Sequence, residues 1–272
     1  MIVSLLTDYG HEDDFVGVVH GVIAGVAPGA RVIDLTHGIP RHGVRSGALV
    51  LARALPYVPA GVHLAVVDPQ VGTERRAVAV RTAEEDRLLV GPDNGLLSLA
   101  WARFGGVVEA VDITRSPHRL EPVSATFHGR DLFAPVAGRL AAGAELADAG
   151  EAIEPGELEA IVLPQARREG GELCAHVLSL DRFGNAALNV SHADLLESGL
   201  ALGREVGLEA GGERYLAIVT HAFADVGAGE LLVYEDAYRN IAVALNRGDA
   251  AATLGLAPDD EVRLRGRNSA EP

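Results

Sequence analysis

The chain contains no lysine, and all 23 of its basic side chains are arginines. Schiff-base chemistry needs a lysine amine, so the usual pyridoxal-dependent enzymes are excluded. A Walker A phosphate loop also requires its lysine, which excludes nucleotide binding of that kind. The sequence has no G-x-G-x-x-G fingerprint after a strand and no G-x-S-x-G nucleophile turn. Several common enzyme classes are therefore removed at the outset.

Cysteines, long apolar runs and basic runs are also scarce. The single cysteine, Cys174, excludes an internal disulfide and fits a reducing cytoplasm. No stretch of about 18 uncharged apolar residues occurs, and the N-terminal MIVSLLTDYG lacks the basic segment of a secretory signal. The net charge is −15, which argues against a nucleic-acid partner. We expect a cytoplasmic protein that neither spans a membrane nor binds nucleic acid.

The first part of the chain alternates apolar runs with helical patterns. Residues 1–6 form a buried-strand pattern, residues 15–26 carry apolar side chains at helical spacing, and residues 31–36 form a second strand pattern. Residues 76–91 instead predict two strands joined by a polar turn. Alternating strands and helices predict a mainly parallel sheet with right-handed crossovers. We therefore expect an α/β domain over residues 1–163.

The pattern changes in the second part of the chain. Residues 164–172 (PQARREGGE) are polar and contain glycine, which predicts a linker. Short strand-like runs separated by turns follow, and these are typical of a small β-barrel or sandwich. We expect this second domain to cover residues 173–268.

Polar turns follow the predicted strands of the first domain. TDYG, DLTHG and DPQVGTERR come after the first three strands, and GPDNG and TFHGRD begin where apolar runs stop. Ligands of open parallel sheets bind at the carboxyl ends of the strands. The sequence therefore predicts a binding site at this edge.

Asp68, Arg75 and His128 are the candidate catalytic residues. Asp68 ends a buried strand, and a proline and a glycine within the next four positions can return the chain so that Arg75 approaches it. The pair is either a structural ion pair or, together with His128, a set that orients and deprotonates a water molecule. Asp8, which ends the first strand, is suited to accept hydrogen bonds from a ribose diol.

Other polar residues near these strand ends have structural explanations. Asp13 or Asp14 can cap the helix that follows, and we expect Asp13 to do so. Asn94, in GPDNG, predicts a turn that leads into a helix. Phe183, in DRFGN, is either a core side chain or free to stack on a flat ring.

The remaining histidines do not predict a metal centre. His37 and His42 lie near Asp34, but the segment lacks an established ligand spacing, and we expect hydrogen bonding within the loop. His20 and Cys174 occur in apolar periodic runs and are expected in the core. We therefore predict no metal ligands.

Taken together, these motifs resemble those of the S-adenosylmethionine (SAM) hydroxide adenosyltransferases, which are relatives of the SAM-dependent fluorinase and chlorinase. The likeness includes TDYG, DDFVG, DLTHGIPRH, DPQVGT, GPDNGLL, TFHGRDLFAP, DRFGN and NIAVALNRGDAA in the family's order, and so covers essentially the whole chain. The resemblance implies an N-terminal α/β domain followed by a C-terminal β-barrel. It also implies a homotrimer, with the SAM site between one subunit's N-terminal domain and a neighbour's C-terminal domain.

The resemblance assigns roles by position. Asp68, Arg75 and His128 match the set thought to activate water in the hydrolysing branch. The halogenating branch has a halide-holding serine in the segment matching TFHG, where this chain has His128 and Gly129, and the long fluorinase loop is absent here. The chain therefore looks like a hydrolase. The implied substrate-binding residues are Asp8, Asp13, Asn94, Phe127 and Gly129 from one subunit, and Asp181, Phe183, Asn185 and Phe223 from its neighbour.

Two departures from the family pattern affect this assignment. Gln70 stands where a glycine is usual, next to the loop that carries Asp68. Glu235 and Asp236 replace small hydroxylic residues that help to hold adenine or methionine. Arg130 and Asp131, by contrast, are expected to form a structural pair that holds the TFHGRD turn.

The reaction expected from the resemblance is attack of water on the ribose 5′ carbon of SAM, which gives adenosine and L-methionine without a cofactor. The sequence leaves open whether Asp68 or His128 takes the proton. It also leaves two other functions open. One is a divalent-metal hydrolase, and the other is a nucleoside-binding module without turnover; the metal ligands would come from Asp8, Asp13, Asp68, Asp93, His37 and His128.

Overall fold

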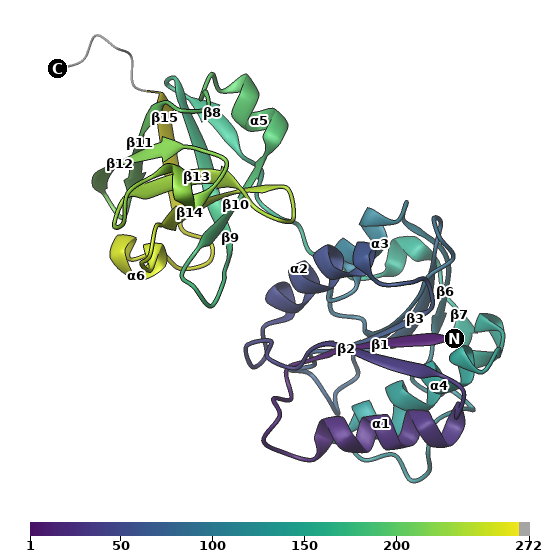
Figure 1. The fold of residues 1–272 in the computed structure, drawn as a ribbon. Helices are drawn as coiled ribbons and strands as arrows, with labels where there is room; N and C mark the ends of the chain where they lie inside the picture. Colours follow the sequence, from purple (N-terminus) through teal and green to yellow (C-terminus); the bar gives the residue numbers. More distant parts are fainter. Residues whose placement is uncertain (267–272) are drawn as a thin grey trace. The chain divides into compact units, whose positions relative to one another are not determined.

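The computed structural model describes residues 1–266, and the chain divides into two compact units, Met1–Ile161 and Val162–Pro272 (Figure 1). The segment expected to be a linker, residues 164–172, contains a short strand, β8 (Arg167–Glu169), because its backbone pairs with that of β9 (Glu172–Leu180). The end expected for the second domain, residue 268, lies outside the described residues.

The first unit is an α/β domain built on a seven-stranded sheet in the order β2-β1-β3-β5-β4-β6-β7. The pairs β1–β2, β1–β3 and β3–β5 are parallel, whereas β4 is antiparallel to both of its neighbours. Five strands therefore run in one direction, and only β4 and β7 oppose them, which confirms the mainly parallel sheet. The strands are β1 (Ile2–Thr7), β2 (Arg31–Thr36), β3 (Val62–Val66), β4 (Ala77–Thr82), β5 (Leu88–Pro92), β6 (Val107–Asp112) and β7 (Glu151–Ala152).

Helices cover both faces of this sheet, with α1 and α4 on one face and α2 and α3 on the other (Figure 1). Successive strand side chains point to opposite faces, so each face needs its own apolar cover. Leu5 and Leu64 pack with α1 and α4 in one core, whereas Leu6 and Ala65 pack with α2 and α3 in a second core. The helices are α1 (Phe15–Val26), α2 (Val44–Ala54), α3 (Ser98–Arg103) and α4 (Ala134–Ala141).

The second unit is a closed β-barrel. Its strands follow the order β10-β14-β13-β12-β11-β15-β9-β8, and an additional β9–β10 pairing closes seven of them into a ring. Closure leaves those seven strands without a free edge. Leu173 and Ala175 belong to the apolar core of the barrel. Cys174, which lies between them on β9, is also buried. The other strands and α-helices of this unit are β10 (Ala186–Ser191), α5 (His192–Glu197), β11 (Glu205–Ala210), β12 (Glu213–Val219), β13 (Leu231–Glu235), β14 (Asn240–Leu245), α6 (Ala250–Leu254) and β15 (Glu261–Gly266).

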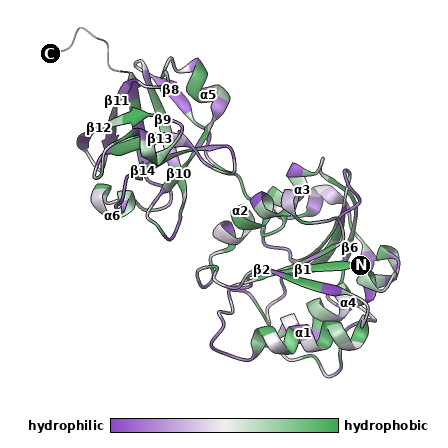
Figure 2. Cartoon of the chain, in the orientation of Figure 1, coloured by the Kyte–Doolittle hydropathy of each residue, from purple (hydrophilic) through white to green (hydrophobic). Residues whose placement is uncertain are grey.

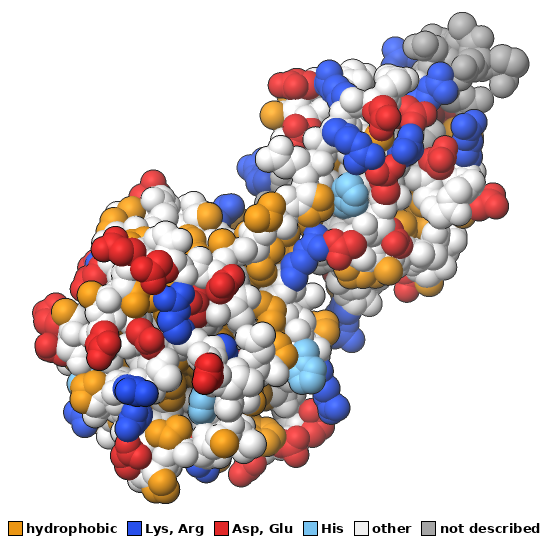
Figure 3. Space-filling view, turned by 180° about the vertical axis from the view of Figure 1, so that it is seen from behind, with side chains coloured by type: hydrophobic (Ala, Val, Ile, Leu, Met, Phe, Trp, Pro, Cys, Tyr) orange, Lys and Arg blue, Asp and Glu red, His pale blue; other side chains and the backbone are white. Residues whose placement is uncertain are grey.

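Apolar residues are concentrated in the strands of the sheet (Figure 2), and charged residues are found on the surface (Figure 3). The strands of the first unit's sheet are predominantly hydrophobic, and the connecting loops are hydrophilic (Figure 2). On the face drawn in Figure 3, acidic side chains are interspersed with arginines rather than separated from them. Within residues 1–266, no helix is long and apolar enough to cross a bilayer.

Candidate active site

A cavity of about 300 Å³ opens where β1 and β3 end in the first unit. The segments that follow these strands contribute Asp8 and Asp68, and the loop before α4 contributes His128. Three of the predicted polar turns, TDYG, DPQVGTERR and TFHGRD, thus meet at the carboxyl edge of the sheet. The cavity is lined by Asp8, Tyr9, Asp13, Phe15, Arg41, His42, Val66, Asp68, Val71, Thr126, Phe127, His128 and Gly129.

Arg75 lies behind the cavity wall and connects Asp68 to His128. Its Nε donates a hydrogen bond to Asp68 Oδ1 at 2.9 Å, and its Nη2 donates to Asp68 Oδ2, so the ion pair is bidentate. The same Nη2 lies 3.2 Å from His128 Nδ1. Asp68 and Arg75 are almost fully buried, and the guanidinium also lies over the Phe133 ring. The structure therefore brings all three predicted catalytic residues together.

Backbone geometry explains how the Asp68 loop returns. Gly72 has φ +80°, a conformation that L side chains rarely adopt, and a Cβ there would fall on the carbonyl oxygen of Ala125. The Thr73 hydroxyl donates to Gln70 O at 2.8 Å and accepts the Arg75 amide at 3.3 Å. The loop thus packs against the segment before His128. Gln70 contributes its backbone carbonyl to the turn.

Burial and the charge of Arg75 together favour the neutral form of His128. Burial lowers the pKa of His128 below 6.5, and the neighbouring guanidinium lowers it further. A guanidinium can only donate hydrogen bonds, so His128 Nδ1 accepts one and has no proton. In the neutral ring the proton is then on Nε2. This arrangement makes His128 a hydrogen-bond donor at its other nitrogen.

Three aromatic rings form an apolar wall of the cavity. The Tyr9 ring centroid lies 5.6 Å from that of Phe15 and 6.0 Å from that of Phe127, and the latter two are 4.9 Å apart. Burial raises the pKa of Tyr9, and the nearby carboxylates of Asp8 and Asp68 raise it further. Tyr9 is therefore a neutral phenol. A Cβ on Gly129 would fall on its hydroxyl oxygen, so Gly129 leaves room for Tyr9.

Asp8 and Asp13 present carboxylates to the cavity. Asp8 Oδ2 accepts a hydrogen bond from the His42 amide at 3.0 Å, and within residues 1–266 its other oxygen has no hydrogen bond. The expectation that Asp13 caps α1 is wrong, because Asp14 occupies the cap position and makes no side-chain cap hydrogen bond there. Asp13 instead lines the cavity.

Sequence comparison places both units in one family. Residues 3–150 match the model of the SAM hydroxide adenosyltransferase N-terminal domain, and residues 175–263 match that of the C-terminal domain. The chain belongs to the SAM hydroxide adenosyltransferase family. The motifs recognised in the sequence had indicated this family, and the comparison confirms it.

Individual relatives extend over nearly the whole chain. An (R)-S-adenosyl-L-methionine hydrolase of Salinispora tropica is 52% identical over 262 residues, which are 96% of this chain and 97% of the relative. A fluorinase of an Actinoplanes species is more distant, at 26% identity over 284 residues and 94% of each chain. The crystal structure of an uncharacterized conserved protein from Thermotoga maritima is similar with a TM-score of 0.90 and 35% identity, covering 97% of this chain and 100% of that one.

The expected structural pair in the TFHGRD turn is confirmed. Arg130 Nε donates to Asp131 Oδ1 at 2.6 Å, and Asp131 Oδ2 accepts the Ser124 amide at 2.8 Å. Asp131 is buried within a single π-helical turn, Gly129–Phe133. This pairing fixes both ends of the segment that carries Phe127 and His128.

Asn94 is not among the residues that line the cavity. Its Nδ2 donates to the Val67 carbonyl at 3.0 Å, and its Oδ1 accepts the Leu96 amide at 3.1 Å. These bonds secure the turn that the GPDNG pattern predicts. Asn94 therefore supports the carboxyl end of β3 from the side.

The predicted neighbour residues belong to the second unit. Asp181 Oδ1 accepts the amides of Phe183 and Asn185 at 2.8 and 3.0 Å, and its Oδ2 accepts Asn185 Nδ2 at 2.8 Å. The DRFGN turn is thereby rigid, and it displays Phe183 with 70% of its surface exposed. Phe183 is not a core residue. Phe223 is 38% exposed and packs against Tyr234.

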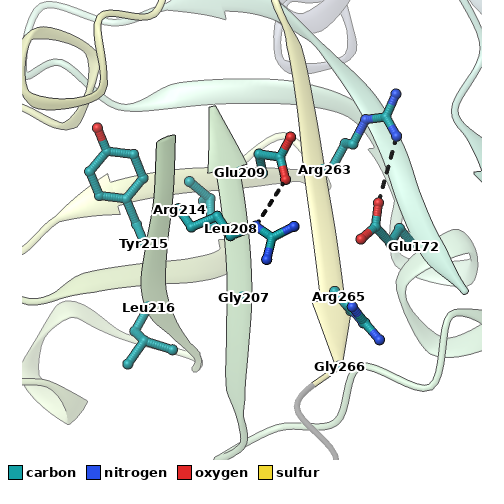
Figure 4. Close-up of a pocket in the computed structure, with 10 residues that line it drawn as sticks. All are labelled: Glu172, Gly207, Leu208, Glu209, Arg214, Tyr215, Leu216, Arg263, Arg265 and Gly266. Atoms are coloured by element: carbon teal, nitrogen blue, oxygen red, sulfur yellow. Dashed lines mark hydrogen bonds and ion pairs between the residues drawn. The ribbon is translucent and has the colours of Figure 1, made fainter. Parts of the chain in front are cut away.

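A further cavity of about 390 Å³ lies on the second unit and contains none of the predicted site residues (Figure 4). It lies over β11, β12 and β15, with ion pairs from Arg214 to Glu209 and from Arg263 to Glu172. Both of its lining glutamates are thus paired with arginines. Since none of the predicted site residues lines this cavity, we do not place the predicted chemistry there.

The histidines of the first unit differ from expectation. His20 is not in the core, because its half-exposed ring bonds Asp34 Oδ1 at 2.8 Å. His37 is buried and bonds Thr7 Oγ1 of β1 at 2.8 Å instead of a partner in its own loop, and burial lowers its pKa. His42 instead lines the cavity.

Sequence reasoning missed several cavity residues, chiefly Tyr9, Phe15, Arg41 and His42. Tyr9 lies inside the TDYG motif, directly after Asp8, so its position at a strand end was a usable signal. Arg41 and His42 precede α2 in a loop whose path depends on tertiary contacts, such as the bond from the His42 amide to Asp8. No local pattern predicts that contact.

Proposed function

We propose that this chain hydrolyses SAM at the ribose 5′ carbon and releases adenosine and L-methionine. The observation that carries the proposal is the buried Asp68–Arg75–His128 set on the wall of the 300 Å³ cavity. Membership of the SAM hydroxide adenosyltransferase family and 52% identity to a SAM hydrolase support it.

The cavity suits a cationic nucleoside. The second carboxylate oxygen of Asp8 accepts hydrogen bonds from the ribose hydroxyls. The carboxylates of Asp13 and Asp68 attract the positive charge of the sulfonium. Phe127 and Tyr9 offer aromatic surface to the ribose and sulfonium region, and aromatic faces attract cations. Gly129 keeps this wall close to Tyr9.

The reaction is a displacement at carbon. A water oxygen forms a bond to C5′ while the C5′–S bond breaks, and sulfur keeps the electron pair as the neutral thioether of methionine. Asp68 takes the water proton, because His128 has its lone pair directed at Arg75 and a proton on Nε2. His128 and Arg75 then orient and stabilise the developing hydroxide.

Charge neutralisation makes a closed site favourable for this step. Hydroxide and sulfonium become two neutral products, so exclusion of bulk water favours the transition state. The Asp68–Arg75 pair is already buried and bidentate before the reaction, so its charges are held in position from the start. The reaction needs no cofactor.

The substrate's stereochemistry is part of the proposal. The Salinispora relative is named a hydrolase of (R)-S-adenosyl-L-methionine, with the R configuration at sulfur. We expect this chain to prefer the same epimer. The sulfonium methyl points in a different direction in the two epimers, so the apolar wall can discriminate between them.

The assembly is a homotrimer in the cytoplasm, with each site completed by a neighbour. Asp181, Phe183 and Asn185 belong to the second unit, and Phe183 is an exposed aromatic side chain on a rigid turn. Exposed aromatic residues of this kind are enriched at interfaces. Phe223 completes this set, and no nucleic acid takes part.

The test is incubation of the purified protein with each SAM epimer in excess EDTA, followed by chromatography for adenosine and methionine. We expect both products in equal amounts from the R epimer. Adenosine formation that stops in EDTA supports the metal-hydrolase alternative, and binding without products supports a nucleoside-binding module. Asp68→Ala, with unchanged circular dichroism, is the control for contaminating activity.

The geometry disfavours the metal hydrolase. Asp93, one of its candidate ligands, is engaged by Arg76 at 2.9 Å and by the Glu159 amide. Among residues 1–266, the one group of three metal-binding side chains with convergent ligand atoms is His20, Asp34 and His37. None of these lines the cavity.

A further inference from the structure

Three side chains from separate segments converge outside the cavity. His20 lies on α1, Asp34 on β2 and His37 just after β2. Asp34 Oδ1 is 2.8 Å from His20 Nε2 and 3.2 Å from His37 Nε2, and all three ligand atoms lie within 4.8 Å of one another. Two imidazole nitrogens thus face one carboxylate oxygen.

Hydrogen bonding accounts for only one of the two ring nitrogens of His37. Its side chain has no exposed surface, and its Nε2, although 3.2 Å from Asp34, has no hydrogen bond of acceptable geometry within the described residues. Buried polar atoms normally have such a partner. Nδ1 of the same ring is already fixed by Thr7 Oγ1 at 2.8 Å. Nε2 is therefore a buried nitrogen directed at a carboxylate and a second imidazole.

We propose that His20, Asp34 and His37 bind one divalent transition-metal ion, with Zn²⁺ as the preferred physiological candidate. Imidazole nitrogen and carboxylate oxygen are ligands that Zn²⁺, Co²⁺ and Ni²⁺ accept. Tetrahedral ligands at about 2.0–2.2 Å from zinc lie roughly 3.3 Å apart. The two separations from Asp34 Oδ1, 2.8 and 3.2 Å, lie at or somewhat below that value, and three protein ligands leave the fourth position to water.

Thr7 orients the buried ligand. Metal-bound histidines donate their other ring N–H to an oxygen, which fixes the ring and its tautomer. Thr7 Oγ1 is such an acceptor for His37 Nδ1, and it also accepts the Tyr9 amide at 3.2 Å. The ligand set therefore has an outer partner already in place.

The position of this site suggests a structural role. A bound ion would tie α1 to β2 and to the loop at His37, whose carbonyl accepts the Gly10 amide at 2.9 Å. That loop and Thr7 flank Asp8 and Tyr9, which line the cavity. The ion would thus fix the backbone beneath the cavity without contacting the reacting water. This proposal replaces the expectation of loop hydrogen bonding alone for His37.

Metal titration of tag-free, EDTA-stripped full-length protein tests the site. Visible absorption with CoCl₂ and calorimetry with ZnCl₂ are expected to show one equivalent bound per chain. His20→Ala and Asp34→Asn are expected to weaken binding at least about tenfold. His20 is 36% exposed, so its removal leaves the core intact. Circular dichroism confirms folding.

His192→Ala is the matched control. His192 forms an exposed histidine–carboxylate pair with Glu235 at 2.7 Å in the second unit and has no third ligand in the set of convergent groups within residues 1–266. This variant is expected to bind the metal as the wild type does. The proposal is overturned if the wild type binds no stoichiometric ion, or if His20→Ala and Asp34→Asn bind as tightly as the wild type. Neither readout involves SAM.

Discussion

Arg75 is the residue on which the local chemistry depends. It occupies both oxygens of Asp68 and the Nδ1 of His128 while remaining almost fully buried. Because guanidinium has donors only, it makes both partners acceptors. A lysine ammonium has no planar donor group and could not hold Asp68 and His128 in this geometry. The proton of neutral His128 is therefore on Nε2. In the reaction we propose, this makes His128 a hydrogen-bond donor and leaves Asp68 as the base.

This assignment predicts different results for two His128 variants. His128→Gln keeps an N–H donor near the Nε2 position, so we expect it to retain measurable hydrolysis. His128→Ala removes the donor, and Asp68→Asn removes the base; each should lower kcat by at least about 100-fold. Single-turnover kinetics with the R epimer measure this. Equal loss in His128→Gln and His128→Ala, with activity retained in Asp68→Asn, would make His128 the base.

Gly129 predicts a steric coupling to Tyr9. Gly129→Ala places a methyl group on the Tyr9 hydroxyl oxygen, so the aromatic wall must shift. Overpacking of this kind costs about 1–3 kcal/mol, and we expect kcat/KM to fall by roughly tenfold or more. Tyr9→Phe removes the clashing oxygen and should restore part of the loss. A double-mutant cycle in kcat/KM measures the coupling; additive effects would contradict it.

At this scale, the sequence predicts the candidate catalytic residues that the structure brings together, but not all of the residues that shape the cavity. Asp68, Arg75 and His128 stand in strand-end motifs and do meet. The expectations for Asp13 and His20 are wrong, because helix capping and apolar periodicity are local rules. The contacts that override them come from β2 and from the cavity.

Among the elements, the loop after β3 and the segment before α4 behave as one support. Gly72 makes their close approach possible. Gly72→Ala combines left-handed strain with a clash against a backbone oxygen, so we expect about 1–3 kcal/mol lower stability and at least tenfold lower kcat. Gly143 has φ +98° and open space within 4 Å of where a Cβ would lie, so Gly143→Ala controls for strain alone. Urea unfolding and kinetics measure both; equal kcat losses would refute the contact.

A buried network joins β1, β3 and Arg87, the residue just before β5. His63 Nδ1 bonds Ser4 Oγ at 2.8 Å, and Arg87 Nη1 lies 3.0 Å from His63 Nε2. Burial lowers the pKa of His63 to about 3, and the charge of Arg87 acts in the same direction. The imidazole is therefore neutral in the folded protein throughout the physiological range.

This network predicts acid sensitivity. Below pH 6.5 the unfolded chain protonates His63 and the folded chain does not, so its stabilising contribution is present above pH 6.5 and is lost as the pH falls toward 3. His63→Gln removes the titration and retains an acceptor for Arg87. The difference in unfolding free energy between wild type and variant should shrink by about 1.4 kcal/mol per pH unit below 6.5. Urea unfolding between pH 7.5 and 5 measures it; a constant difference would contradict the network.

The elements were largely predictable because their patterns are local. Residues 76–91 do form two antiparallel strands, β4 and β5. The π-helical turn Gly129–Phe133 was not predictable, since it depends on the burial of Asp131 and its bond to the Ser124 amide. The barrel's closing β9–β10 pair and its parallel β12–β13 pair likewise depend on the path of the whole unit.

For the whole molecule, each unit supplies its own core and its own share of the predicted site residues. All members of the first unit's hydrophobic clusters lie between residues 3 and 158, and all members of the second unit's clusters lie between residues 166 and 264. The change of sequence pattern predicts this division, because each unit buries a complete set of strands. Subunit assembly has no such local signal and rests on the family resemblance and on the exposed Phe183.

A site shared between subunits predicts complementation. Asp68→Ala inactivates the first unit of a chain, and Asp181→Ala removes the acceptor that fixes Phe183 and Asn185 in the second. If every site combines one subunit's first unit with a neighbour's second unit, co-assembled chains at equal amounts contain about one intact site in four. We therefore expect roughly a quarter of wild-type activity from the mixture.

Each variant alone should be nearly inactive, and the mixture's activity should appear only after dissociation and reassembly or co-expression. Sedimentation velocity of the mixture should give one species of trimer mass. A site formed within a single chain yields no recovery, because every chain then has a defect in its own site. Recovery in a monomeric or dimeric species would keep the shared site and refute the trimer, so the two parts of the assembly proposal are tested separately.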